Sequence, residues 1–283
     1  MMRISSLRHV TVVLCLWAAL SGLSSQTMAQ WTMGGRAVAM AKAGTALPSD
    51  NWAVFHNPAL IDVEERHFGL FAIRYYGLRE LEDHAAVITF PGSFSFRGDE
   101  MSFGVAAGIH SYGFKLFRET QIRGGWSIRR KRLRFGMVMN YVHLQISGYG
   151  STGLPAVDTG LAVELIRGFR VGYRVANLFL GGSGYGEIDR YPAEMAIGLS
   201  WNGMPRLLMT SELVKDVLYP VSFRTAMEWE GVAGIFFRGG WTTAPLTWST
   251  GAGFQLSRVT ANIAVQKHPV LGLSPGIDFS FTF

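Results

Sequence analysis

The last eight residues of the chain, 276–283, read GIDFSFTF. From Ile277 onward the odd positions are Ile or Phe, and the even positions from Asp278 to Thr282 are polar. Such alternation with a period of two is typical of a half-buried β-strand, because successive side chains point to opposite faces. This stretch therefore predicts a strand that ends at Phe283.

The same period continues through the chain from residue 66 onward. It predicts fourteen strands, at residues 66–76, 81–90, 101–111, 114–128, 132–146, 154–166, 169–179, 191–202, 205–215, 219–229, 231–241, 246–256, 258–267 and 274–283. Most are near the length that a tilted strand needs to cross a bilayer, and the number is even, as in bacterial outer-membrane barrels. The fold expected is all-β: a transmembrane antiparallel barrel.

The composition agrees with a membrane barrel. Hydrophobic residues make up 48% of the chain and charged residues only 16%, whereas about 25% charge is usual in soluble proteins. The one cysteine, Cys15, lies near the N-terminus, so disulfides and thiolate metal sites are not expected. A soluble β-sandwich is the alternative reading of the same alternation.

The N-terminus predicts export. Residues 1–29 have a basic start, an apolar core at residues 10–20 and a small-residue cleavage site after Ala29. That core is too short for an ordinary transmembrane helix. We therefore predict a secretory signal at 1–29, a plug segment at 30–65 and the barrel at 66–283.

The links between strands predict an orientation. Very short links are expected at Gly168, at residues 203–204, at Glu230 and at Ser257, and mostly longer links on the other side. This asymmetry is typical of outer-membrane barrels, whose short turns are periplasmic. Both termini are then periplasmic. Residues 91–100 form a long link on the short side and depart from the rule.

The polar faces of the strands carry charges of both signs. In a barrel these side chains would fill the lumen and pair with one another, because charge removed from water needs a partner. In a sandwich they would be solvated. The lumen charges expected are Glu164, Arg170, Arg174, Glu194, Glu212, Arg224, Glu228 and Arg238, with Glu119, Arg123 and Asp278 on the same faces.

Residues 34–60, GGRAVAMAKAGTALPSDNWAVFHNPAL, precede the first strand. Their small residues predict a closely packing helix, which Pro48 ends. Arg36 and Asp50 are expected to meet lumen charges. Asn57 is expected to brace the following turn, and Pro58 to fix the chain direction before the first strand.

Together, this string and the terminal strand resemble the FadL/PorV-like outer-membrane barrels. The resemblance implies that residues 34–60 lie inside or beneath the barrel as a plug, and that Phe283 is read by the barrel assembly machinery. The plug residues that carry it are Gly34, Gly35, Arg36, Ala37, Met40, Asp50, Asn57 and Pro58.

The resemblance implies two activities, neither of them enzymatic. PorV/PorQ-type proteins assist type IX protein secretion and surface attachment, whereas FadL-type proteins pass hydrophobic small molecules. The chain leaves little length for the long outer loops of the transporters, which favours the PorV/PorQ-type reading and keeps hydrophobic passage as the alternative. A purely structural barrel is a third reading.

No other chemistry is expected from the motifs. The chain has no G-x-S-x-G elbow, P-loop or H-E-x-x-H motif, and its histidines have no ligand spacing. We expect no cofactor and no nucleic acid. The partners expected are outer-membrane lipid, the assembly machinery, and either secretion-system proteins or hydrophobic ligands.

Overall fold

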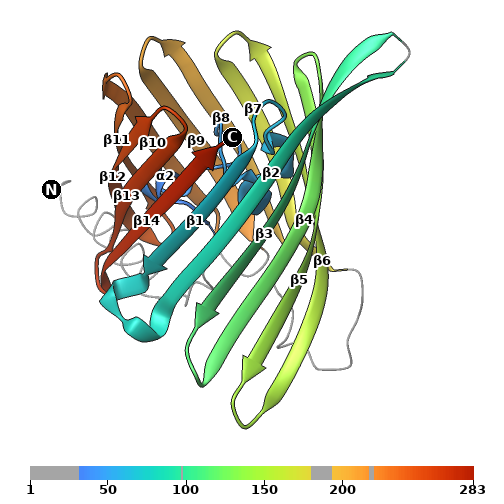
Figure 1. The fold of residues 1–283 in the computed structure, drawn as a ribbon. Coiled ribbons are helices and arrows are strands. Elements are labelled where there is room, and N and C mark those ends of the chain that lie inside the picture. Colours follow the sequence, from blue (N-terminus) through green and yellow to red (C-terminus); the bar gives the residue numbers. More distant parts are fainter. Residues whose placement is uncertain (1–31, 97, 180–192, 217–219) are drawn as a thin grey trace, which may run out of the picture. The chain divides into compact units, whose positions relative to one another are not determined.

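The computed structural model describes residues 32–283 except residues 97, 180–192 and 217–219, so the predicted signal lies outside the described residues. Fourteen antiparallel strands follow one another in chain order, and β1 pairs with β14 to close the barrel (Figure 1). The strands are β1 His67–Arg74, β2 Glu82–Phe96, β3 Asp99–Gly113, β4 Phe117–Arg130, β5 Leu133–Ile146, β6 Gly150–Ile166, β7 Phe169–Phe179, β8 Glu194–Met204, β9 Leu207–Asp216, β10 Ser222–Val232, β11 Ile235–Thr243, β12 Leu246–Leu256, β13 Val259–His268 and β14 Gly272–Thr282. The predicted fourteen-strand transmembrane barrel is confirmed.

The two faces of each strand differ in exposure, as the period of two requires. On β14, Phe279 is 52% exposed and the neighbouring Asp278 is 1% exposed. On β1, Leu70 is 50% exposed and Phe71 is 4% exposed. Large apolar side chains therefore cover the outside, where hydrocarbon solvates them, and the inward faces, polar on β14 but largely apolar on β1, line the lumen.

The helices are all short. They are α2 Gly35–Ala39, α3 Ala53–His56, η1 Pro58–Leu60, η2 Tyr75–Gly77 and η3 Arg79–Leu81. No helix in residues 32–283, the gaps aside, is long and apolar enough to span a membrane.

The two ends of the barrel differ in their connections. At the end that holds the first residue of β1 and the last of β14, here called the turn end, each of the six links has two residues. The opposite end is here called the loop end. Its shortest link is residues 244–245 and its longest is residues 180–193, and most residues of that longest link lie outside the described residues. The expected asymmetry is thus present, although the β11–β12 link is as short as those of the turn end.

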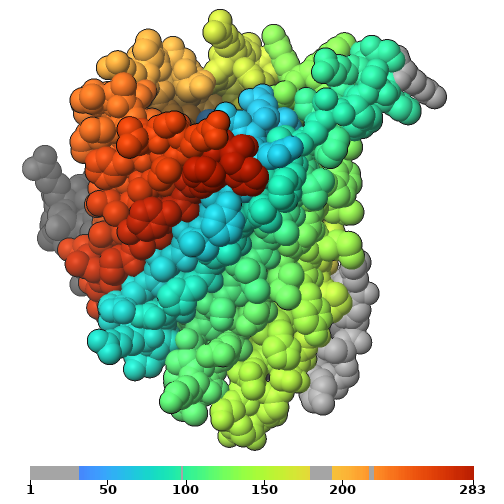
Figure 2. Space-filling view, in the orientation of Figure 1, coloured from blue at the N-terminus to red at the C-terminus, as the bar shows by residue number. Residues whose placement is uncertain are grey.

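Three link positions differ from the prediction. Residues 203–204 belong to β8 and Glu230 belongs to β10, so these turns lie a few residues further along, at 205–206 and 233–234. Residues 91–100 are not a long loop. Pro91 and Gly92 resemble a turn signal, but β2 continues through them because it has no β1 partner beyond Thr89, and an edge strand tolerates proline. The resulting β2–β3 hairpin projects beyond the turn end, at the upper right of Figures 1 and 2.

Candidate functional site: the segment inside the barrel

Residues 32–62, here called the lumenal segment, cross the interior of the barrel before β1 begins. Helix α2 contacts β11–β14, α3 contacts β3 and β4, and η1 contacts β4–β6, so the segment reaches opposite walls. Met33, Val38 and Met40 have no exposed surface. The interior is therefore occupied by the chain's own N-terminal residues.

The predicted helix is present, but it is shorter than the stretch up to Pro48 that was expected. Helix α2 ends at Ala39, and Ala41 and Lys42 have positive φ angles of 52° and 64°, which an α-helix does not allow. Isolated short helices are marginal, so contacts with the wall decide the path of this stretch. The turn carries the chain from β12, beside Ala39, to β7, beside Thr45.

Glycines on the inner wall let the backbone of the segment approach the strands. A methyl group added at any of four of these glycines would collide with the segment. At Gly104, Gly136 and Gly172 it would meet the carbonyl groups of Asp62, Pro58 and Thr45, respectively, and at Gly160 it would meet the side chain of Asn57. These glycines lie on β3, β5, β7 and β6. They form a band of close contact between wall and segment, which larger residues would prevent.

We expect Gly136→Ala to weaken the docking of the lumenal segment by about 1–3 kcal/mol, the usual cost of overpacking, because the backbone of Pro58 must move. Hydrogen–deuterium exchange of residues 32–62 in detergent should become faster. Gly124→Ala on β4 is the matched control, since its added carbon meets nothing within 4 Å. Equal exchange in the two variants would show that the glycine contact does not hold the segment.

Glu228 on β10 joins the segment to the wall through two arginines. Arg36 donates from Nη2 to Oε1 at 2.7 Å and from Nε to Oε2 at 2.8 Å, a bidentate pair. Arg238 on β11 donates from Nε to Oε2 at 2.5 Å. The side chains of Arg36, Glu228 and Arg238 are only 17%, 9% and 4% exposed, so one carboxylate balances two buried cations.

Asp278 on β14 binds the start of α2. It accepts hydrogen bonds from the backbone N–H groups of Gly35 and, at 3.4 Å, of Arg36. Asn262 on β13 donates to its other oxygen at 2.8 Å. The two N-terminal N–H groups of the helix are thereby satisfied by the wall.

Glu212 on β9 binds the middle of the segment. It accepts a hydrogen bond from the N–H of Thr45 at 2.9 Å and an ion pair from Arg224 at 3.1 Å. Arg224 also donates to the carbonyl of Lys42 at 3.3 Å. Burial and the positive charge of Arg224 lower the pKa of Lys42 to about 8.

Asp50 was expected to meet a charge on the lumen wall, but it pairs with His56, which belongs to the lumenal segment itself. It also accepts the N–H of Trp52 at 3.1 Å. Burial opposes ionisation of Asp50, but the contacts with His56, the attraction to Arg36 and the hydrogen bond from the Trp52 N–H together lower the pKa of the carboxyl. This pair braces the bend between α2 and α3.

Asn57 braces the chain in the way that its position suggests. Its amide nitrogen donates to the carbonyl of Thr45 at 2.6 Å, and its oxygen accepts the N–H of Ala59 at 3.0 Å. Pro58 opens η1, the last turn before β1.

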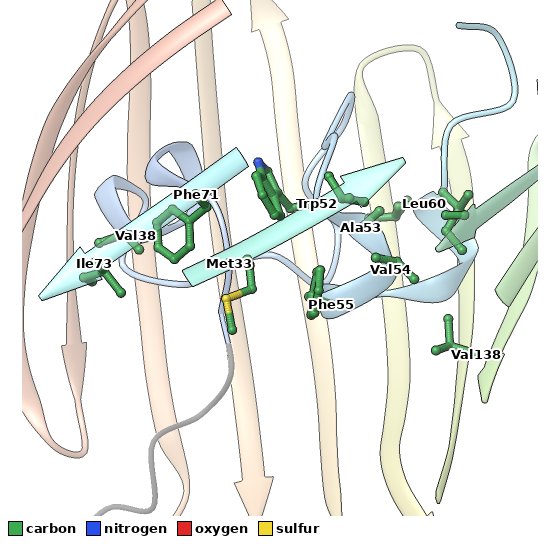
Figure 3. Packing of buried hydrophobic residues seen from close by; sticks show 14 of the residues in the cluster. Met33, Val38, Trp52, Ala53, Val54, Phe55, Leu60, Phe71, Ile73 and Val138 are labelled. Carbon is green, nitrogen blue, oxygen red and sulfur yellow. The ribbon is translucent and has the colours of Figure 1, made fainter. Parts of the chain in front are cut away.

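The opposite side of the segment is apolar. Trp52 meets Phe71 of β1 edge-on, with ring centroids 5.8 Å apart, and tilts against Phe55 at 6.1 Å. Figure 3 shows the apolar cluster, which extends from Ile73 and Phe71, past Trp52 and Phe55, to Leu60. The segment thus meets β9–β14 through an ion pair and several hydrogen bonds, and it packs apolar side chains against β1–β3.

The remaining predicted residues have these positions. Gly34 packs against Trp52 with a φ of 91°, and Ala37 and Met40 are fully buried. Arg174 pairs with Glu194 and donates to Thr45 Oγ1 at 3.3 Å. Glu164 on β6 and Arg170 on β7 lie opposite each other nearer the turn end, and both are half-buried. Among the described residues, neither forms a hydrogen bond with the lumenal segment. Phe283 lies edge-on to Phe90 at the turn end.

Sequence reasoning placed Arg123 in the lumen but missed two other wall residues, Asp158 and Ser127. Asp158 on β6 accepts from Arg123 at 2.8 Å, and Arg123 also donates to the carbonyl of Val54 at 3.2 Å. Ser127 donates to the carbonyl of Ile61 at 2.8 Å. Polar residues at even spacing on each strand were the available signal, but the alternation alone does not show which of them touch the segment.

Among the described residues, no group of three or more His, Cys, Asp or Glu side chains could hold a metal ion. The carboxylates that face the segment are occupied by arginines and backbone N–H groups. The arrangement holds the segment in place.

Fold and site together define a class: a transmembrane β-barrel whose lumen is filled by its own N-terminal segment. No family model and no curated protein matches the chain. Among solved structures, the CymD monoaromatic hydrocarbon channel is similar, with a TM-score of 0.66 and 13% identity over 91% of this chain and 99% of that one. The toluene transporter TodX of Pseudomonas putida has a TM-score of 0.59 and 12% identity over 87% of this chain and 96% of that one.

At these identities the likeness shows the fold alone. It supports the barrel expected from the FadL-like part of the resemblance. Neither structure is a PorV- or PorQ-type protein, so that narrower resemblance stays a prediction.

Proposed function

We propose that the protein is a non-enzymatic outer-membrane channel for small hydrophobic molecules, with the lumenal segment as its plug and both termini in the periplasm. The observation that carries the proposal is the apolar seam between this segment and β1–β3. It runs from Tyr75 at the loop end, past Phe71 and Trp52, to Ile61 and Ala106 nearer the turn end. Tyr76, Leu81 and Tyr112 pack against it at the loop end.

For an apolar molecule, passage along the seam has a lower free-energy cost than passage along the other side of the segment. An apolar guest that enters between Trp52 and Phe71 replaces apolar contacts with others of the same kind. Separating the segment from β10 would instead leave Arg36 without its carboxylate partner Glu228, which costs several kcal/mol. Small hydrophobic molecules therefore fit the asymmetry of the site better than ions or sugars.

The similar structures support this function, because one is described as a monoaromatic hydrocarbon channel and the other as a toluene transporter. The sequence favoured the other activity, assistance to type IX secretion and surface attachment, on the shortness of the loops. No contact in the described residues favours it. Copurification of secretion-system proteins with the full chain would support that role.

Measurement of hydrocarbon uptake into vesicles tests whether the protein is a channel. We expect vesicles that contain the protein to take up a radiolabelled monoaromatic hydrocarbon faster than empty vesicles. Ile73→Asn places an amide in the seam and should slow this uptake roughly tenfold, which corresponds to a barrier about 1.4 kcal/mol higher.

Ile73→Val, which keeps the seam apolar, is the control and should retain most of the uptake. Uptake by the natural protein no faster than by empty vesicles would contradict the channel and favour a structural barrel. Equal uptake by the two variants would contradict the seam as its route.

A further inference from the structure

The β2–β3 hairpin continues beyond the wall of the barrel at the turn end. The register of β2 with β1 ends at Thr89, and that of β3 with β4 begins at Ser102. Pairing of β2 with β3 continues to Phe96 and Asp99. Residues 90–103, here called the rim ribbon, thus form a two-stranded extension, most of which pairs only with itself (Figures 1 and 2).

The rim ribbon is amphipathic. Phe94 and Phe96, 40% and 57% exposed, alternate with Ser93 and Ser95, and Phe90, on the same face of β2, is 44% exposed. Alternation along β2 places these phenyl rings on the outward face of the strand, the face that carries the lipid-facing residues within the barrel. Across the ribbon, Phe94 packs against Phe103 with ring centroids 6.0 Å apart.

The apolar face of the ribbon is continuous with the outer surface of the barrel. Phe90 lies edge-on to Phe283, with ring centroids 6.4 Å apart, so the band of outward aromatics passes from β14 onto the ribbon. The far end of the ribbon is tied to the end of β4, because Asp99, which lies opposite Phe96, pairs with Arg130. Nearer the barrel, Arg129 donates to Ser102 at 3.3 Å. The ribbon therefore keeps a defined side toward the membrane.

We propose that the rim ribbon lies along the bilayer at the boundary between phospholipid headgroups and acyl chains, with Phe94 and Phe96 in the lipid. A two-stranded hairpin is marginal in water by itself, and a lipid surface supplies the apolar layer that it lacks. Aromatic side chains favour this interface. The unpaired backbone groups along the outer edge of residues 91–96 keep the ribbon out of the hydrocarbon core, where nothing would hydrogen-bond to them.

Single-cysteine labelling tests the depth of the ribbon. The only natural cysteine, Cys15, is in the predicted signal, so Phe94→Cys and Ser95→Cys each place one thiol in the exported chain. Each thiol is labelled with an environment-sensitive fluorophore, and the protein is reconstituted in vesicles of phosphatidylethanolamine and phosphatidylglycerol. Emission is then quenched by lipid nitroxides at the headgroup, by lipid nitroxides at the acyl-chain end, or by aqueous iodide.

We expect the label at position 94 to emit at shorter wavelength than the label at 95, and to be quenched severalfold more by headgroup nitroxide than by acyl-end nitroxide. Iodide should quench position 95 more strongly. Heat-modifiable migration confirms that both variants are folded. Equal iodide quenching at the two positions would place the ribbon in water, and shielding of position 94 from every quencher would place it against protein; either result overturns the proposal.

Discussion

Removal of residues 34–56 is expected to raise the single-channel conductance of the protein in planar bilayers from near zero to that of an open barrel. These residues include α2 and α3, which contact opposite walls of the lumen. Their loss leaves η1 to lead the chain into β1 and leaves every strand pair intact. The barrel should therefore fold while its interior fills with water.

The folded state of the deletion variant must be checked first, by heat-modifiable migration in detergent gels. Gly124→Ala provides a folded reference with an undisturbed interior, and its conductance should equal that of the natural protein. An unchanged conductance in a folded deletion variant would mean that residues 34–56 do not close the barrel. The FadL/PorV-like resemblance would then lose its main support.

Replacement of Glu228 by alanine is expected to cost about 3–5 kcal/mol, the usual penalty when one partner of a buried ion pair is removed. The cost is large because Arg36 and Arg238 both lose their carboxylate, and both side chains are mostly out of water. Thermal melts in detergent, followed by circular dichroism, measure the loss. Exchange of residues 32–62 should also become faster, because Arg36 anchors the segment.

A double-mutant cycle with Arg36→Ala separates the two arginines. If Arg36 and Glu228 are coupled, the double variant should be less destabilised than the sum of the single ones. Glu82→Ala, which removes the exposed pair with Arg74, is the matched control and should leave the melt nearly unchanged. Melts of Glu228→Ala and Glu82→Ala that coincide would indicate a hydrated lumen that screens these charges.

The alternation of the sequence determined the strands and the side that each residue faces. A strand has only two faces, so a run such as 276–283 places Asp278 in the lumen as soon as its phenylalanines face lipid. For the same reason Glu212, Glu228 and Arg238 could be assigned to the interior without knowledge of any contact. The number of strands and the short turn end followed from the same local pattern.

The tertiary structure alone decided which interior residues meet. Arg36 binds Glu228, whereas Asp50 turns to His56, because the depth and path of the lumenal segment set the distances. No local pattern encodes that path: the small residues predicted a helix that runs to Pro48, whereas α2 ends at Ala39 and wall contacts set the path beyond it. Likewise, Gly136 reads as an ordinary strand glycine until Pro58 is found against it. The strand faces are set by neighbours in sequence, but the closing of the lumen depends on groups that only the closed barrel brings together.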